Sequence, residues 1–114
     1  MCITIYHNNR WKKSRETLQL LRDNGHQPTV IEYLKNPPNV KELYNICKAM
    51  GKAPRELLRK GEHEYKTEKI HQIDGDDDLI MAMVRHPKLI ERPIVIRGKR
   101  GIIGRPPENV LKLL

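Results

Sequence analysis

The sequence has no phenylalanine, one tryptophan and four tyrosines among its 114 residues. Leucine, isoleucine, valine and methionine must therefore build its hydrophobic core. No apolar run approaches the roughly 20 residues that a membrane-spanning helix requires, so we expect no membrane segment. The N-terminus also lacks the charged and apolar regions of a signal peptide, which makes a cytoplasmic location the expectation.

Cysteine is scarce as well. Cys2 and Cys47 have 44 residues between them, which fits neither a CxxC motif nor a disulfide framework. The histidines and acids form no HxxxH or HExxH pattern, so we predict no metal site. The acidic run over residues 76–78 does not change this expectation, because consecutive side chains on a helix do not converge. We interpret the run as a helix first turn, where the dipole favours carboxylates.

Positive charge is abundant. The chain has 22 Lys and Arg against 14 Asp and Glu, a formal net charge of +8. This balance favours anionic partners, from a small oxyanion to nucleic acid. Few aromatic residues are present for base stacking, so nucleic acid is not the favoured partner. The length suits a single domain over residues 1–114.

Periodic patterns predict alternating strands and helices. The strands are expected over residues 2–6, 29–33, 93–96 and 100–103. Helices are expected from Ser14 as N-cap to a stop at Gly25, and over residues 39–50, 54–60, 76–86 and 108–114. Residues 61–75 are polar and weakly patterned. The order β-α-β-α-α-α-β-β-α predicts an α/β (α+β) fold, a four-stranded mixed sheet with flanking helices and a final antiparallel hairpin.

The loop between the first strand and the first helix is the first candidate site. It carries four cations, which are Arg10, Lys12, Lys13 and Arg15. A helix N-terminus directs unpaired backbone N–H groups and the positive end of its dipole at one point. An anion held at this loop is one hypothesis, and a solvated basic loop is the other.

The element order is that of the thioredoxin-like fold, and several motifs go further. In sequence order they are Ile3–Asn8, Lys13–Leu18, Tyr33–Pro38, Arg55–Lys60, His86–Val95 and Gly104–Glu108. Together these motifs, which span essentially the whole chain, resemble the glutaredoxin-dependent arsenate reductases, a family of bacterial oxidoreductases. The resemblance implies arsenate reduction to arsenite, with glutathione and glutaredoxin as reductant and with no bound cofactor.

The resemblance also assigns site residues. In the family, the loop reads roughly His-Asn-Pro-x-Cys-x-x-Ser-Arg, and its cysteine attacks arsenate. Arg59, Arg92 and Arg105 match the three arginines that hold the oxyanion, and arginine binds tetrahedral oxyanions through two parallel N–H groups. A cis peptide bond is implied before Pro93. The supporting loop residues are His7, Asn8, Lys12, Ser14 and Arg15.

The loop departs from the family at three neighbouring positions, Asn9, Trp11 and Lys12. Trp11 stands where the family has its nucleophilic cysteine, and Asn9 stands where it has proline. Indole has no thiol, so the route through a cysteine–arsenic adduct is closed and we expect no reductase activity. Binding of a small oxyanion such as arsenate, phosphate or sulfate is expected to remain, with glutaredoxin as the protein partner that the family implies.

Two alternatives remain open at this point. In one, the natural protein had cysteine and Trp11 is an engineered or variant residue. In the other, the chain resembles Spx-type transcription regulators, which share the fold and bind RNA polymerase without reducing arsenate. The CxxC motif that those regulators usually carry in this loop is absent here.

Overall fold

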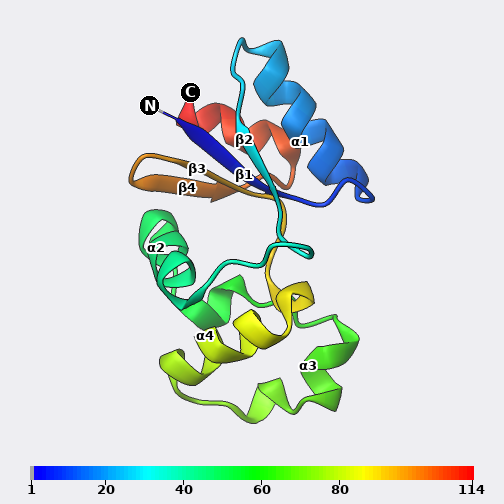
Figure 1. The fold of residues 1–114 in the computed structure, drawn as a ribbon, viewed down its shortest axis with the longest axis vertical. Coiled ribbons are helices and arrows are strands. Elements are labelled where there is room, and N and C mark those ends of the chain that lie inside the picture. The colour runs from blue at the N-terminus through cyan, green and yellow to red at the C-terminus, as the bar shows by residue number, and fades with distance from the viewer. Residues whose placement is uncertain (1) are drawn as a thin grey trace. The chain divides into compact units, whose positions relative to one another are not determined.

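Four strands form one mixed sheet in the computed structural model, which describes residues 2–114 (Figure 1). The strands are β1 (Ile3–His7), β2 (Thr29–Glu32), β3 (Ile94–Arg97) and β4 (Arg100–Ile103), in the spatial order β2-β1-β3-β4. β1 pairs in parallel with β2 and antiparallel with β3, and β3 pairs antiparallel with β4. The predicted α/β fold with a four-stranded mixed sheet is confirmed, and each strand begins and ends within one residue of its expected position.

The chain divides into two compact units. The first contains the residues up to Asn36 together with Arg92–Leu114, and the second contains Pro37–Glu91. The sheet lies in the first unit with helix α1 (Lys12–Asp23) and the 3-10 helix η4 (Pro107–Leu113). The single domain that the length favours stays a prediction.

One face of the sheet carries the hydrophobic core of the first unit. Residues two apart on a strand point to the same face, so Ile3 and Ile5 of β1 lie on the same side as Val95 of β3. α1 and η4 cover this face (Figure 1). Their core residues are Leu18, Leu21, Val110 and Leu113. Burial of these aliphatic side chains is the main stabilising contribution, at ~25 cal/mol per Å² of apolar surface.

Helix α1 ends as expected and begins earlier than expected. The N–H of Gly25, at φ 82°, donates to Arg22 O, and the N–H of His26 donates to Leu21 O, which is a Schellman motif. The helix begins at Lys12, and Trp11 occupies the N-cap position without a side-chain cap. The prediction of Ser14 as N-cap is therefore wrong. Ser14 is buried in the first turn, where its hydroxyl bonds to the preceding loop.

The second unit is helical. Its elements are α2 (Val40–Met50), η1 (Pro54–Leu57), α3 (His63–Thr67), η2 (Ile70–Gln72), α4 (Asp76–Arg85) and η3 (Pro87–Leu89). Asn39 and Glu42 form a capping box at the start of α2, and Gly51 ends it in the left-handed conformation. The Tyr44 hydroxyl donates to the Asp77 carboxylate and joins α2 to α4.

Three helical predictions need correction. The helix expected from Pro54 is the single 3-10 turn η1, and the expected C-terminal α-helix is the 3-10 helix η4. Segment 61–75, for which no element was expected, contains α3 and η2. α3 buries none of its residues, so it has no apolar stripe that periodicity could detect.

The basic tip of the β3–β4 hairpin has a structural role. The guanidinium of Arg97 donates to Leu113 O at 2.8 Å, and that of Arg100 donates to Lys112 O at 2.7 Å. Carbonyl groups at a helix C-terminus have no intrahelical partner and carry partial negative charge. The two arginines therefore cap η4 and hold it against the sheet.

A close contact at Gly104 joins α1 to the end of β4. Gly104 N donates to Pro93 O at 2.8 Å, and Thr17 Oγ1 donates to Gly104 O at 2.9 Å. A Cβ atom at Gly104 would lie 2.7 Å from both Thr17 Cγ2 and Thr17 Oγ1, and 3.1 Å from Pro93 Cγ. Thr17 is fully buried and short, so it has no room to move away. Position 104 therefore requires glycine, because the side chains of Thr17 and Pro93 approach its Cα too closely for a Cβ atom.

Gly104→Ala is expected to lower the free energy of unfolding by about 1–3 kcal/mol, because the added methyl group overpacks a buried contact. Urea unfolding measures the change. Gly61→Ala is the matched control, since a Cβ there meets nothing within 4 Å. The double variant with Thr17→Ala should recover part of the loss. Equal stability of Gly104→Ala and the parent protein would contradict this account.

Candidate functional site

The loop between β1 and α1 is shaped by the buried hydroxyl of Ser14. Asn8 N–H donates to Ser14 Oγ at 3.1 Å, and Ser14 Oγ lies 2.6 Å from His7 Nδ1. Asn8 Oδ1 accepts from Arg10 N at 3.0 Å, and Asn8 O accepts from Trp11 N at 3.1 Å. Each of these bonds fixes a different point of the loop. The turn that delivers Trp11 to the start of α1 is therefore fully determined.

His7 is part of this network as a neutral imidazole. Its side chain is 3% exposed, and this burial lowers the pKa of His7 below its ordinary value of 6.5. The hydrogen bond to Asn9 and the charge of Glu32 act in the opposite direction. With the Ser14 hydroxyl donating to Nδ1, the proton lies on Nε2, which is 3.5 Å from Asn9 Oδ1.

Trp11 and Arg92 are brought together from segments that are far apart in the sequence. The guanidinium carbon of Arg92 lies 3.4 Å from the centroid of the Trp11 ring. This is a cation–π stack, and arginine stacks well because its guanidinium is planar and weakly hydrated. Arg92 is 4% exposed, whereas Trp11 is 44% exposed. A buried cation therefore holds an exposed indole in place.

The hydrogen bond from Gly104 N to Pro93 O brings together the segments of two predicted site residues, because Arg105 follows Gly104 and Arg92 precedes Pro93. The Arg92–Pro93 peptide bond is cis, and so is Arg105–Pro106. Because Gly104 N is bonded to Pro93 O, the segments that carry Arg92 and Arg105 adjoin each other. Arg105 is exposed, and its carbonyl accepts from the Asn109 side chain at 3.2 Å. The structure thus brings two of the three predicted arginines onto neighbouring segments.

Arg59, the third predicted arginine, belongs to the second unit. Its backbone N–H donates to Leu89 O at 2.7 Å, next to an isolated bridge between Leu58 and Ile90. Its guanidinium Nε lies 3.2 Å from Glu62 Oε1 in a half-buried ion pair. Arg59 therefore has a carboxylate partner within its own unit, and its place in an anion site stays a prediction.

The other loop cations point into solvent. Lys12 and Lys13 both lie 3.9 Å from Glu16, and their side chains are 78% and 55% exposed. Exposed pairs at this distance contribute little stability. The Arg15 guanidinium donates to Asn9 O at 2.9 Å and so ties the helix to the loop. Lys12 and Lys13 are thus available to a dissolved anion, while Arg15 also supports the loop.

Neither cysteine is part of the loop. Cys2 is exposed and precedes β1, so it lies ~16 Å from the loop at about 3.3 Å per strand residue. Cys47 is buried on α2, and burial raises the pKa of its thiol, with the charge of Asp76 acting in the same direction. A raised pKa leaves little thiolate, which is the nucleophilic form.

Sequence reasoning missed the roles of Thr17 and Gly104 and the tertiary role of the Ser14 hydroxyl. The position of Gly104 directly before Arg105-Pro106 is the one local sign that this glycine matters. No local pattern indicates which side chain packs against it. The resemblance assigned Trp11 and Arg92 to the same site, but it did not indicate that the two side chains stack directly on each other. Asn9 Oδ1 supplies the acceptor for His7 Nε2.

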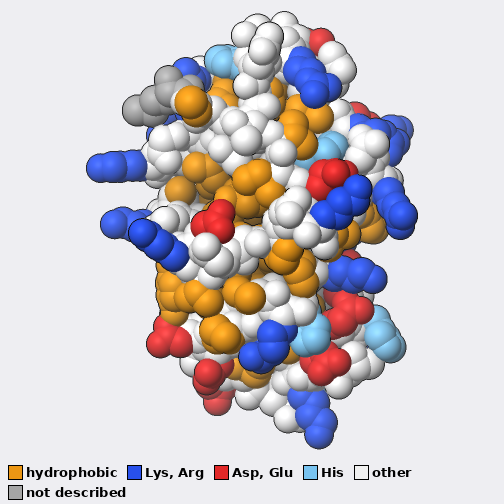
Figure 2. Space-filling model, in the orientation of Figure 1, with side chains coloured by type: hydrophobic (Ala, Val, Ile, Leu, Met, Phe, Trp, Pro, Cys, Tyr) orange, Lys and Arg blue, Asp and Glu red, His pale blue; other side chains and the backbone are white. Residues whose placement is uncertain are grey.

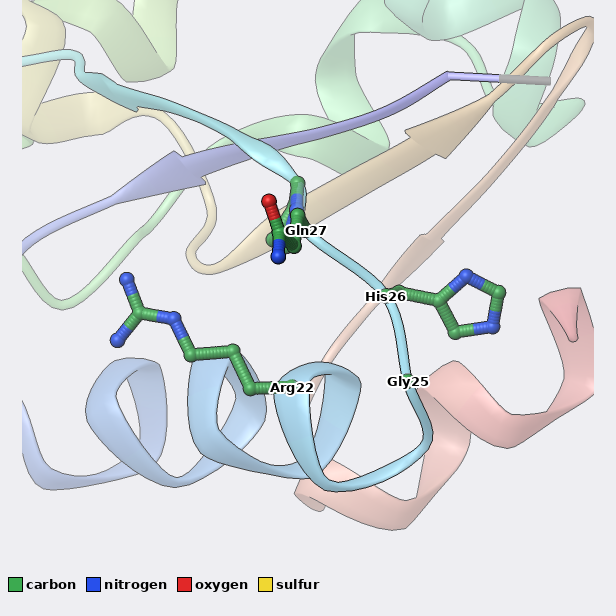
Figure 3. A pocket seen from close by; sticks show the side chains of 5 residues that line it. Arg22, Gly25, His26 and Gln27 are labelled. Carbon is green, nitrogen blue, oxygen red and sulfur yellow. The ribbon is translucent and has the colours of Figure 1, made fainter.

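A pocket at the opposite end of α1 has no comparable chemistry. It is lined by Arg22, Gly25, His26, Gln27 and Pro28 (Figure 3). In Figure 3 the side chains of Arg22, His26 and Gln27 point in different directions and do not converge. A helix of 12 residues is ~18 Å long, so this pocket is well separated from the loop before α1.

Within residues 2–114, no group of three or more His, Cys, Asp or Glu side chains is placed to hold a metal ion. In the same part of the chain, no helix is long and apolar enough to cross a lipid bilayer.

Comparison with known proteins identifies close relatives. Residues 6–113 match the model of the ArsC family. The chain is 43% identical over its full length to an arsenate reductase of Haemophilus influenzae and covers that whole protein. It is 45% identical to the uncharacterized protein YfgD of Escherichia coli, covering 98% of this chain and 96% of that one. An arsenate reductase of Vibrio cholerae superimposes with a TM-score of 0.95 at 45% identity, over 100% of this chain and 98% of its own.

The neutral state of His7 predicts a pH dependence of stability. Because the folded pKa lies below the ordinary value of 6.5, the unfolded chain binds more protons between these two values. The free energy of unfolding should thus be highest above about pH 6.5 and fall as the pH decreases through that window, by at most ~1.4 kcal/mol per pH unit. His7→Gln should flatten this slope in urea unfolding, while His26→Gln should keep it. An unchanged slope in His7→Gln would contradict the assignment.

Proposed function

Because the chain belongs to the ArsC family, we propose that it binds small tetrahedral oxyanions and does not reduce arsenate by thiol chemistry. The observation that carries the proposal is the stack of Trp11 on Arg92. Trp11 stands at the expected position of the nucleophile, and Arg92 is one of the arginines expected to hold the oxyanion. Their contact supports a shared site at the start of α1.

The loss of reduction follows from the chemistry of Trp11. Family members that reduce arsenate need a thiolate, and indole offers neither a sulfur atom nor an ionisable group near neutral pH. Cys2 lies at the other end of β1, and Cys47 is buried with a raised pKa. Glutathione and glutaredoxin, the reductants that the family implies, have no sulfur–arsenic adduct to act on.

Retention of oxyanion binding follows from the geometry of the stack. Indole covers a face of the guanidinium, whereas the guanidinium N–H groups lie in its plane and point outward from its edge. Stacking on Trp11 is therefore compatible with hydrogen bonds from Arg92 to an anion. Arg105 lies on the adjoining segment and is the second arginine of the proposed site. The exposed side chains of Lys12 and Lys13 add positive charge to the site, and salt screens the attraction of this charge for an anion.

We expect Trp11→Cys to gain arsenate-dependent turnover, because a cysteine at this position lies beside Arg92 and at the start of α1, where its thiolate is favoured. The measurement is NADPH oxidation coupled through glutathione reductase and glutaredoxin. The parent protein and Trp11→Ser, which has no thiol, should show none. Turnover by the parent protein would overturn the proposal, and turnover by none of the three would contradict the site assignment.

Oxyanion binding is expected to be weak and salt-sensitive. Two charge-assisted hydrogen bonds correspond to a Kd on the order of 1 mM, or ~4 kcal/mol. Isothermal titration with arsenate, phosphate and sulfate at low ionic strength measures it. Arg92→Ala should weaken binding by about tenfold or more, since one such bond is worth ~1.5–3 kcal/mol. Lys99→Ala, which removes a charge at the hairpin tip, should change it little. The absence of heat with all three anions would refute the proposal.

A further inference from the structure

Two leucines at the end of η4 are exposed to solvent. Leu111 is 44% exposed and Leu114 is 41% exposed, whereas Val110 and Leu113 are buried in the core of the first unit. A 3-10 helix has three residues per turn, so side chains three positions apart lie one above the other. The N–H of Leu114 donates to Leu111 O at 3.2 Å, which continues this turn to Leu114. The buried pair thus faces the core, and the exposed pair forms an apolar surface that we call the leucine ridge.

Four cations gather at the same end of η4. Lys112 lies between the two leucines, and the turn of the β3–β4 hairpin supplies Arg97, Lys99 and Arg100. The hydrogen bonds from Arg97 to Leu113 O and from Arg100 to Lys112 O hold the hairpin against this end of the helix. Positively charged side chains project from the left edge of the molecule in Figure 2, where Figure 1 draws the turn between β3 and β4.

The charge of these four side chains is not compensated. None of them forms an ion pair with another of the described residues. The carbonyl groups that Arg97 and Arg100 bind carry no net charge. Residues 92–114 contain six Lys and Arg and a single acid, Glu108, near the start of η4. At about 2 Å per residue Glu108 lies ~12 Å from Leu114 along the helix, so the ridge is apolar with a positive rim.

The first unit as a whole carries the net charge of the chain. Residues 1–36 and 92–114 contain 12 Lys and Arg against 4 Asp and Glu, whereas residues 37–91 contain 10 of each. The formal charge of +8 therefore belongs entirely to the unit that contains the leucine ridge. Such a field attracts anionic surfaces and raises the rate of association with them, and salt screens it.

From these observations we propose that the leucine ridge docks the protein on an anionic lipid surface. Leu111 and Leu114 enter the boundary between headgroups and acyl chains, and the Lys and Arg side chains remain at the lipid phosphates. A short amphipathic segment lies on a membrane in this way without spanning it. The binding is weak and reversible, because each cation near an anionic surface contributes only about fivefold in affinity.

The composition of the ridge disfavours the other occupants. A symmetric contact with a second copy would place two sets of four cations against each other, and like charges across an interface are unfavourable. The cores of protein–protein interfaces are enriched in aromatic residues and depleted in lysine. Residues 92–114 contain no aromatic residue, and two lysines adjoin the ridge. Single-stranded nucleic acid also binds by stacking on aromatic rings, for which leucine is no substitute.

The leucine ridge and the loop of Trp11 lie at opposite ends of β1. Arg97 pairs with Ile3 at the start of the strand, and the loop follows His7 at its end. The two ends are ~13 Å apart at about 3.3 Å per strand residue. Docking through the ridge is therefore independent of the proposed oxyanion site. Trp11 is the sole tryptophan, so its fluorescence reports whether the loop enters the lipid instead.

Co-sedimentation with vesicles at low salt measures this binding. Vesicles of phosphatidylcholine and phosphatidylserine should bind the protein at least about tenfold more tightly than vesicles of phosphatidylcholine alone. The double variant Leu111→Ser with Leu114→Ser should weaken binding about tenfold, and Lys99→Ala about fivefold. The emission of Trp11 should keep its wavelength on binding.

Two variants in the second unit are matched controls. Met81→Ser removes a side chain of α4 that is 42% exposed, and Lys48→Ala removes an exposed cation of α2. Both should keep the affinity of the parent protein for the anionic vesicles. The double serine variant should still bind phosphate as the parent does, which separates a failure of the ridge from a failure of the proposed oxyanion site.

Several outcomes would overturn the inference. Equal binding to both kinds of vesicle would exclude the role of the cations, and equal affinity of the double serine variant and the parent would exclude the role of the leucines. A blue shift of Trp11 emission on the vesicles would place the loop in the lipid. A dimer mass in light scattering that the double serine variant abolishes would assign the ridge to a second copy, and tighter binding to an oligonucleotide than to the anionic vesicles would assign it to nucleic acid.

Discussion

The Ser14 hydroxyl is the interaction on which the site depends. It receives the N–H of Asn8 and lies 2.6 Å from Nδ1 of His7, so it joins the end of β1 to the first turn of α1. The group is fully buried, and leaving any of its partners unsatisfied there would cost ~1–3 kcal/mol. The loop has little freedom as a result, and Trp11 is placed at the N-cap although its side chain cannot act as a cap.

The sequence was informative wherever the determinant was local. Alternation over residues 2–6 and 93–96 predicted the strands, and the stop signals at Gly25 and Gly51 were correct because each supplies a left-handed residue. Ser14 shows the limit of this reasoning. A serine near the start of a helix is an N-cap by propensity, but here its hydroxyl is used in a tertiary network, and only the folded chain reveals which partner it has.

The features of the site that the sequence did not predict are contacts between residues far apart in the chain. Arg92 and Trp11 are 81 positions apart, and no pattern in either segment indicates that a buried guanidinium meets an exposed indole. The same holds for Thr17 and Gly104, whose close approach depends on how α1 crosses the end of β4. The resemblance to known proteins supplied the candidates Arg92 and Arg105. It could not supply the stack, because the resemblance implies a cysteine at the position of Trp11.

The hydrogen bonds that shape the loop, which we call its frame, do not involve the side chain of its central residue, Trp11. The loop can therefore keep its shape with different side chains at position 11. His7, Asn8 and Ser14, which form the network, agree with the loop that the resemblance implies, whereas Asn9, Trp11 and Lys12 depart from it. Asn9 accepts from His7 in place of a proline, so that departure adds a polar contact to the frame. At the position where the resemblance implies a small nucleophile, Trp11 has a large ring stacked on a cation. The loop can thus keep its cations Arg10, Lys12, Lys13 and Arg15 without a nucleophile, because the indole forms no covalent bond to arsenic.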